Sequence, residues 1–219
     1  MAKKIGVVLS GCGVYDGAEI HESVLTLLSL DRRGAEAVLC APDAPQMHVV
    51  NHLTGQVEAG ASRNVLAESA RIARGAIRDV AQVKAGEIDG LILPGGFGAA
   101  KNLCDFAVKG ASCAVHPEVA RLVREVHAQG KPVGAVCIAP ALVAKVLGAE
   151  KPRLTIGTDE ATAQGLEAMG ATHVACAVTE VAVDRERKLV STPAYMLGKR
   201  ISEVADGIDK AVGALLAMA

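Results

Sequence analysis

Aromatic residues are nearly absent from this sequence, which has no Trp, two Tyr and two Phe among its 219 residues. Because bases stack on aromatic rings, this scarcity argues against a protein that binds single-stranded nucleic acid. A formal net charge of only −1 gives no electrostatic reason to expect nucleic acid or a charged membrane surface as a partner. Apolar residues make up 51% of the chain, so we expect a large core packed with Val, Leu, Ile and Ala.

Long apolar runs are absent as well. The longest largely apolar stretch, 133–144, lies between two lysines and falls short of the ~18 residues that a membrane span needs. The opening stretch MAKKIGVVLSGCG runs straight into a glycine turn, unlike a secretory signal. Metal-ligand spacings such as CxxC are missing too, since the cysteines are scattered at positions 12, 40, 104, 113, 137 and 176. We therefore expect reduced thiols, a cytoplasmic location, no membrane partner, and no metal or other cofactor.

Short β-branched runs alternate with longer segments of helical spacing along the chain. The pattern predicts strands at 4–10, 35–42, 88–98, 131–137, 153–159 and 171–178, and a hairpin over 181–193. It predicts helices from 19 onward, over 65–73, 117–130 and 139–148, and from about 195 to 218. Such alternation, without a linker or repeat, is typical of one α/β domain, here 1–219, with a mostly parallel sheet sandwiched between helices.

In the stretch KPVGAVCIAPALVAKVL, the thiol of Cys137 lies where a predicted strand ends and a predicted helix begins. The small residues Ala135 and Ala139 allow strand and helix to approach closely there. Pro140 is tolerated only in the first turn of a helix, which puts the helix start next to Cys137. Unpaired N–H groups and the helix dipole would then favour a thiolate, so the pattern predicts a nucleophile elbow. The alternative is that Cys137 is a small buried apolar residue at a crowded turn.

Two further strand ends carry candidate chemistry, and the carboxyl ends of parallel strands meet at one edge of a sheet. In PGGFG, the glycines aim a backbone N–H of Gly96 into the site, where with that of Ile138 it would form an oxyanion hole. An ordinary glycine turn is the alternative. In SGCGVYDGAEIHE, Glu19 opens the first helix. If it points toward Cys137, burial would raise its pKa and let it donate a hydrogen bond to the thiolate, whereas a solvated carboxylate is the alternative.

The first loop permits two other interpretations. The glycines over 11–17 follow the pattern G-x-G-x-x-x-G, which approximates a dinucleotide-binding turn, with Asp43 as a candidate ribose ligand. The signal is weak, because Tyr15 and Asp16 would crowd and repel a pyrophosphate. Cys12, in the same loop, is the rival of Cys137 for the role of reactive thiol.

These strand ends, in this order, resemble the ThiJ/PfpI superfamily, whose fold is flavodoxin-like and of the class I glutamine amidotransferase type. Within it, the sequence is similar to the ElbB-like glyoxalases, the group known as "enhancing lycopene biosynthesis". The resemblance covers essentially the whole chain. The stretches that carry it are GVVLSGCGVYDGAEIHE, NHLTG, ASRNVLAESARI, PGGFGAAKNL, CIAPAL, RLTIGTD, STPAYM and GIDK.

The resemblance implies a cytoplasmic homodimer with glyoxalase III activity, a lyase that converts methylglyoxal or glyoxal to lactate or glycolate without glutathione. It makes Cys137 the nucleophile and Glu19 its carboxylic partner, with Gly96 and Ile138 at the oxyanion positions. The substrate would be a small dicarbonyl compound.

One departure from the superfamily pattern concerns histidine. Many members place a His after the elbow helix, where this chain reads TIGTDEAT. We therefore consider Asp159, His21 and His116 as supporting residues. A second hypothesis is a redox-sensing or partner-binding protein with little catalysis, in which the elbow cysteine is an oxidation site.

Overall fold

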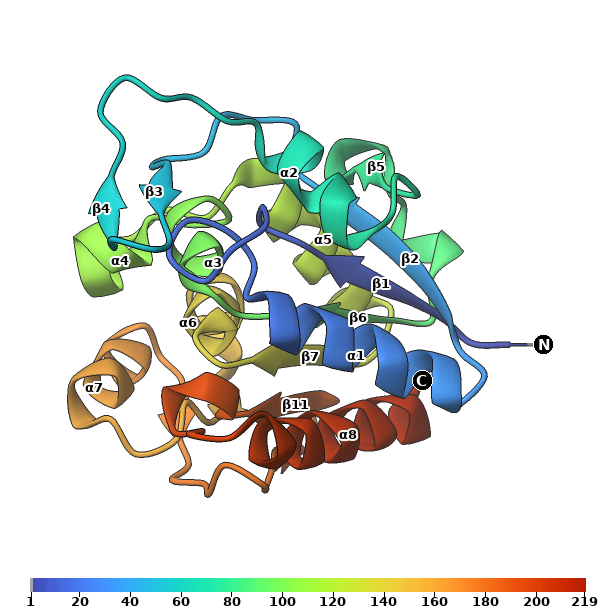
Figure 1. The fold of residues 1–219 in the computed structure, drawn as a ribbon. Coiled ribbons are helices and arrows are strands. Elements are labelled where there is room, and N and C mark those ends of the chain that lie inside the picture. Colours follow the sequence, from blue (N-terminus) through green and yellow to red (C-terminus); the bar gives the residue numbers. More distant parts are fainter. Residues whose placement is uncertain (1) are drawn as a thin grey trace.

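The computed structural model describes residues 2–219 and contains a seven-stranded sheet in the order β10-β11-β7-β6-β1-β2-β5 (Figure 1). All neighbouring strands run parallel except β10 and β11, which form the predicted hairpin. The strands are β1 (Lys4–Val8), β2 (Glu36–Ala41), β5 (Arg78–Asp79), β6 (Gly90–Leu93), β7 (Val133–Val136), β10 (Ala182–Asp184) and β11 (Leu189–Thr192). The predicted α/β class with a mostly parallel sheet is confirmed.

Helices cover both faces of this sheet, as Figure 1 shows. On one face, α1 (Ile20–Arg32), α2 (Val65–Ile72) and α8 (Ile201–Met218) pack on the strands, and α1 lies along α8. On the other face lie α5 (Pro117–Ala128) and α6 (Ala139–Leu147). Every residue of the central strands β6 and β7 is buried. The sandwich explains why these strands read as continuous apolar runs.

Local sequence signals set several element boundaries. Pro117 stands at the first position of α5, and Gly130 follows that helix with a φ of +67°. Pro140 lies in the first turn of α6, where a missing N–H is harmless. A side chain at Gly134 of β7 would approach Leu215 of α8, so this glycine allows the last helix to sit close to the sheet.

Other elements were not predicted or differ from the prediction. The excursion 43–62 contains a small antiparallel pair, β3 (Val50–Asn51) and β4 (Gln56–Val57). Strands β8 (Arg153–Leu154) and β9 (Thr172–His173) pair with each other instead of extending the main sheet. Three helices were missed: α3 (Phe97–Lys101), α4 (Phe106–Lys109) and α7 (Glu160–Ala168).

The last helix starts later than predicted. A 3-10 turn, Ala194–Met196, precedes it, and Ala194 has a φ of +44°, which a continuous helix cannot accommodate. Helix α8 therefore begins at Ile201. Among residues 2–219, we find no helix that combines the length and the apolar character needed to cross a membrane.

Candidate active site at Cys137

Cys137 occupies the strand-to-helix turn between β7 and α6, with a φ of +61°. A positive φ is unfavourable for a residue with a side chain, and such strain is typical of a nucleophile elbow. The turn is held by the N–H of Cys137, which donates to the carbonyl of Thr192 in β11 at 2.9 Å. The backbone N–H groups of Gly96 and Ile138 hydrogen-bond the sulfur and lower the pKa of the thiol. The structure thus brings together the cysteine and both donors that the sequence analysis singled out.

The carboxyl group hydrogen-bonded to the sulfur of Cys137 belongs to Glu22, so the assignment of this partner role to Glu19 is wrong. Glu22 is fully buried, and its Oε2 and Oε1 accept the backbone N–H groups of Gly95 at 3.0 Å and Tyr195 at 3.1 Å. Glu19 instead caps α1, because its Oε2 accepts the N–H of Glu22 at 2.6 Å. The capping residue lies outside the helix, whereas Glu22 lies one turn inside it and faces the strand ends.

Gly95 allows this close packing. A Cβ atom at that position would collide with Cβ of Cys137 and with Oε2 of Glu22. At Gly96, where φ is +91°, a Cβ atom would meet the backbone of Gly17 and Glu19. Gly95 and Gly96 therefore let β6 end against both other strand-end loops, and an ordinary glycine turn does not describe them.

Burial dominates the proton affinity of the pair. It raises the pKa of Glu22 from 4.5 to about 7, while the N–H of Tyr195 acts in the opposite direction. Burial, followed by the charge of Glu22, raises the pKa of the Cys137 thiol well above its ordinary value. The expectation that the helix dipole leaves a free thiolate is therefore wrong, because desolvation outweighs the two N–H donors. The two acids lose their protons one after the other, Glu22 before Cys137.

A cavity of about 470 Å³ opens above the sulfur of Cys137. The cysteine residue is 6% exposed to solvent. The lining of the cavity is mostly apolar and comes from every segment that ends at this edge of the sheet. The residues are Val14, Glu19, Gly96, Phe97, Ala100, Phe106, Ala107, Cys137, Ile138, Asp159, Thr162, Tyr195 and Met196. Glu19 thus keeps a place in the site, although it does not pair with the thiol.

The supporting residues are placed less directly. Asp159 lines the cavity, but its carboxylate caps α7 by accepting the N–H of Thr162 at 2.8 Å. His21 lies on the surface with its Nδ1 2.8 Å from the hydroxyl of Tyr195, so it reaches the cavity only through that tyrosine. His116 precedes α5 and does not line the cavity. Within residues 2–219, no histidine lines it, and Glu22 is the group that contacts the thiol.

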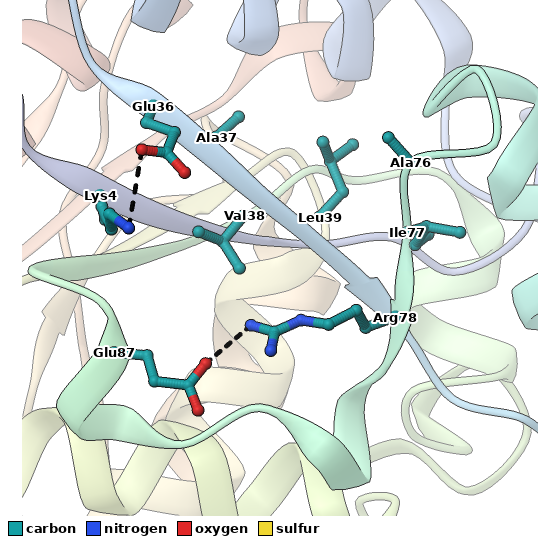
Figure 2. A pocket seen from close by; sticks show the side chains of 9 residues that line it. All are labelled: Lys4, Glu36, Ala37, Val38, Leu39, Ala76, Ile77, Arg78 and Glu87. Carbon is teal, nitrogen blue, oxygen red and sulfur yellow. Dashed lines mark hydrogen bonds and ion pairs between the residues drawn. The ribbon is translucent and has the colours of Figure 1, made fainter.

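A second hollow, of about 480 Å³, lies along β2 from its amino end (Figure 2). Here β5 pairs only with the last residues of β2, which leaves part of that strand edge open. Its charged groups are already paired, Lys4 with Glu36 at 3.7 Å and Arg78 with Glu87 at 2.9 Å. This hollow has nearly the same volume as the Cys137 cavity. It differs in its side chains, because the described residues that line it include no cysteine and no histidine.

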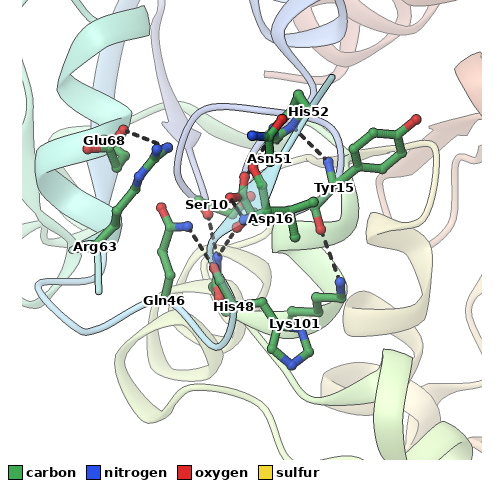
Figure 3. A network of polar contacts seen from close by, with 12 residues as sticks. Ser10, Tyr15, Asp16, Gln46, His48, Asn51, His52, Arg63, Glu68 and Lys101 are labelled. Carbon is green, nitrogen blue, oxygen red and sulfur yellow. Dashed lines mark hydrogen bonds and ion pairs between the residues drawn. The ribbon is translucent and has the colours of Figure 1, made fainter. Parts of the chain in front are cut away.

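The glycine loop after β1 is covered by protein groups, as Figure 3 shows. Asp16 is buried there, and its Oδ2 accepts the N–H of Val50 at 2.7 Å. His52 accepts the N–H of Tyr15 at 3.2 Å, and its ring would obstruct any side chain at Gly13. The segment 43–62 therefore locks this loop, leaving a buried carboxylate where a pyrophosphate would lie. The structure does not support the dinucleotide-binding interpretation.

The remaining cysteines lack a comparable setting. None of the six cysteines, all within residues 2–219, forms a disulfide. Burial is the largest influence on Cys12 and raises the pKa of its thiol, with the charge of Glu68 adding to the effect. No backbone donor lowers the pKa of Cys12, in contrast to Cys137. Cys137 is therefore the better candidate nucleophile.

Fold and site together define an α/β protein with a buried cysteine–glutamate pair at a nucleophile elbow. The chain belongs to the DJ-1/PfpI family, whose family model matches residues 12–192. This confirms the ThiJ/PfpI resemblance at the level of the family.

Relatives extend over nearly the full chain. The human protein "glutamine amidotransferase-like class 1 domain-containing protein 3, mitochondrial" is 49% identical, with 98% of this chain and 83% of the human protein covered. The Danio rerio "ES1 protein, mitochondrial" is 34% identical over 88% of this chain and 76% of its own length. These names correct the expectation of a cytoplasmic location, which rested on the scattered cysteines, the opening stretch and the family resemblance.

Two solved structures show how far the fold extends. An isoprenoid biosynthesis protein with an amidotransferase-like domain from Ehrlichia chaffeensis superimposes with a TM-score of 0.91 at 37% identity, covering 98% of this chain and 99% of that one. Glyoxalase III from Candida albicans superimposes with a TM-score of 0.62 at 13% identity, covering 97% of each chain. At that identity, the second likeness shows the fold alone.

Proposed function

We propose that the protein is an ElbB-like glyoxalase that converts a small 2-oxoaldehyde to a 2-hydroxy acid without glutathione. The observation that carries the proposal is the setting of Cys137. Its sulfur lies at the floor of a cavity, beside the carboxyl of Glu22 and facing two backbone donors. These are the parts that covalent catalysis on a carbonyl needs: a nucleophile, an adjacent base and an oxyanion site.

In the first step, the sulfur of Cys137 attacks the aldehyde carbon and forms a carbon–sulfur bond. Glu22 takes the thiol proton, and its raised pKa of about 7 suits it to exchange protons near neutral pH. The N–H groups of Gly96 and Ile138, which contact the sulfur, lie where they can stabilise the developing oxyanion. Protonation of that oxygen gives a hemithioacetal.

In the second step, a base removes the proton from the former aldehyde carbon, and a proton is delivered to the neighbouring carbonyl carbon. The product is a thioester that carries a hydroxyl group. Glu19 is suited to move this proton, because it lines the cavity, whereas Glu22 is fully buried and does not line it. Water then cleaves the thioester, which releases the hydroxy acid and restores the thiol. The overall change adds one water molecule and needs no oxidant or reductant.

The test is turnover by the purified protein. Methylglyoxal should give lactate without glutathione, and Cys137→Ala should abolish the reaction. A Cys137→Ala variant with undiminished turnover would remove the proposal. The homodimer implied by the resemblance stays a prediction, which sedimentation of the same preparation would check.

The redox-sensing alternative has less support from the site. A thiolate oxidises more readily than a thiol, and burial raises the pKa of Cys137. Mass spectrometry after mild peroxide treatment distinguishes the two functions. Selective oxidation of Cys137 together with no turnover of any aldehyde would favour the sensor.

A further inference from the structure

The chain's few aromatic residues gather at the Cys137 cavity. Of its two Phe and two Tyr residues, Phe97, Phe106 and Tyr195 line this one cavity. Within residues 2–219, the core is built from aliphatic residues, and no aromatic ring is among the fully buried side chains. Aromatic rings supply large apolar contact area. Their concentration here indicates that these rings contact a ligand more than they contribute to the packing of the core.

These rings come from separate segments that converge only in the folded chain. Phe97 begins α3, Phe106 begins α4, and Tyr195 follows β11. Phe97 is 49% exposed, so much of its apolar ring faces solvent. Burying such surface against an apolar group is favourable at roughly 25 cal/mol per Å². The cavity wall is therefore suited to an apolar substituent next to the reacting sulfur.

The charges around the cavity select against anions. Glu19 and Asp159 line it, and none of its lining residues is Lys, Arg or His. Lys101 lies outside, with its ammonium 5.0 Å from the centre of the Phe97 ring and donating to the carbonyl of Tyr15 at 3.0 Å. A carboxylate or phosphate group on a substrate would find two acidic side chains and no cationic partner in the lining.

The size of the cavity agrees with a substrate larger than methylglyoxal. Its volume of about 470 Å³ falls within the roughly 300–1,000 Å³ of pockets that bind drug-sized molecules. A dicarbonyl as small as methylglyoxal fills only a fraction of that space and leaves the phenylalanine rings uncovered.

We infer that the Cys137 cavity takes an uncharged 2-oxoaldehyde that bears an aryl or branched apolar group, with the rings of Phe97 and Phe106 covering that group. The inference rests on the proposed function for its chemistry. The covalent steps stay the same, so phenylglyoxal, the aryl probe, would add to Cys137, isomerise and leave as mandelate after hydrolysis.

The experiment compares kcat/KM for phenylglyoxal, methylglyoxal and the anionic 2-oxoaldehyde 4-carboxyphenylglyoxal. We expect phenylglyoxal to exceed methylglyoxal at least about tenfold and 4-carboxyphenylglyoxal to be a poorer substrate than phenylglyoxal. Phe106→Ala should lower the ratio of phenylglyoxal to methylglyoxal. Val108→Ala is the matched control, because Val108 lies on the same helix, is 65% exposed and does not line the cavity, so the ratio should stay unchanged. A ratio near one, or a ratio that Phe106→Ala does not change, would overturn the inference.

Binding to Cys137→Ala separates the two proposals, because it requires no turnover. We expect acetophenone to raise the melting temperature of this variant more than acetone or benzoate does. If no dicarbonyl is turned over but acetophenone binds selectively, the proposed function fails and the ligand class stands. If methylglyoxal is turned over but acetophenone has no advantage over acetone, the ligand class fails and the proposed function stands.

Discussion

Two hollows of nearly equal volume, about 470 and 480 Å³, lie at opposite ends of the sheet and differ in almost everything else. The Cys137 cavity opens where β1, β6 and β7 end. The other hollow borders β1 and β2 at their first residues, Lys4 and Glu36. In open α/β sheets, the carboxyl ends of strands are where helix N-termini and unpaired N–H groups collect. The position of a hollow relative to the strand ends, more than its volume, therefore determines whether it can hold a catalytic site.

The two hollows also treat their charges differently. At the β2 edge, Arg78 and Glu87 form an ion pair whose side chains are 42% and 40% exposed. Beside Cys137, Glu22 is fully buried, and burial raises its pKa to about 7. An exposed ion pair contributes about 0–1 kcal/mol to stability. A buried carboxyl group with a raised pKa can instead exchange protons near neutral pH.

The largest effect is expected from Cys137→Ser. Loss of the nucleophile should reduce turnover of 2-oxoaldehydes at least about 10³-fold, since a hydroxyl has no base strong enough beside it. Steady-state kinetics with methylglyoxal and phenylglyoxal would measure this. Cys176→Ser is the matched control, because that cysteine is half-buried away from the cavity and its loss should leave turnover unchanged.

The next largest effect distinguishes the two glutamates. Glu22→Gln keeps the shape but removes the base beside the sulfur, and should lower kcat about 10²–10³-fold. Glu19→Gln should have a smaller effect, because that carboxylate does not contact the thiol. Kinetics of both variants at neutral pH would check the order. A Glu22→Gln variant that keeps the wild-type kcat would contradict the pairing of Glu22 with Cys137.

Stability should depend on pH through Glu22. Its pKa is 4.5 when unfolded and about 7 when buried, so the native state holds an extra proton between these values. The contribution of Glu22 to stability, about 3 kcal/mol, is then fully present below pH 4.5 and is lost as pH rises through about 7. Urea unfolding of the wild type and Glu22→Gln across this range would measure the difference. Parallel pH curves for the two proteins would show that Glu22 is not the titrating group.

The smallest effect is expected at the other hollow. Arg78→Ala breaks an exposed ion pair, so it should change stability by less than about 1 kcal/mol and leave turnover unchanged. Thermal unfolding and a methylglyoxal assay would check this. A loss of turnover on this substitution would show that the two hollows are coupled.

The sequence predicted those parts of the molecule that depend on local pattern. The alternation of strand and helix patterns predicted the parallel sheet. The small residues and Pro140 around Cys137 predicted the strand-to-helix turn, because these signals lie next to it in the sequence. The choice between Glu19 and Glu22 could not be made this way. Glu19 caps α1 and Glu22 follows it by three residues, and only the packing of α1 on the sheet decides which of them faces the strand ends.

Features assembled from distant segments also escaped prediction. The cavity wall joins Phe97, Phe106 and Tyr195, although PGGFG and STPAYM, two of the stretches that carry the family resemblance, already contained the first and the last. Helix α7 begins at a capping interaction of Asp159, which the sequence analysis considered only as a candidate site residue. Long-range packing, more than local propensity, determined these parts.

The central claim is that Cys137 and Glu22 titrate as one buried pair. The most direct test is the rate at which iodoacetamide alkylates Cys137 as a function of pH, in the wild type, Glu22→Gln and Glu19→Gln. The wild-type profile should show a step near pH 7, from Glu22, that disappears in Glu22→Gln. In Glu19→Gln the step should persist and move to lower pH, because the charge of Glu19 raises the pKa of Glu22. A step that survives in Glu22→Gln, or that only Glu19→Gln removes, would contradict the account.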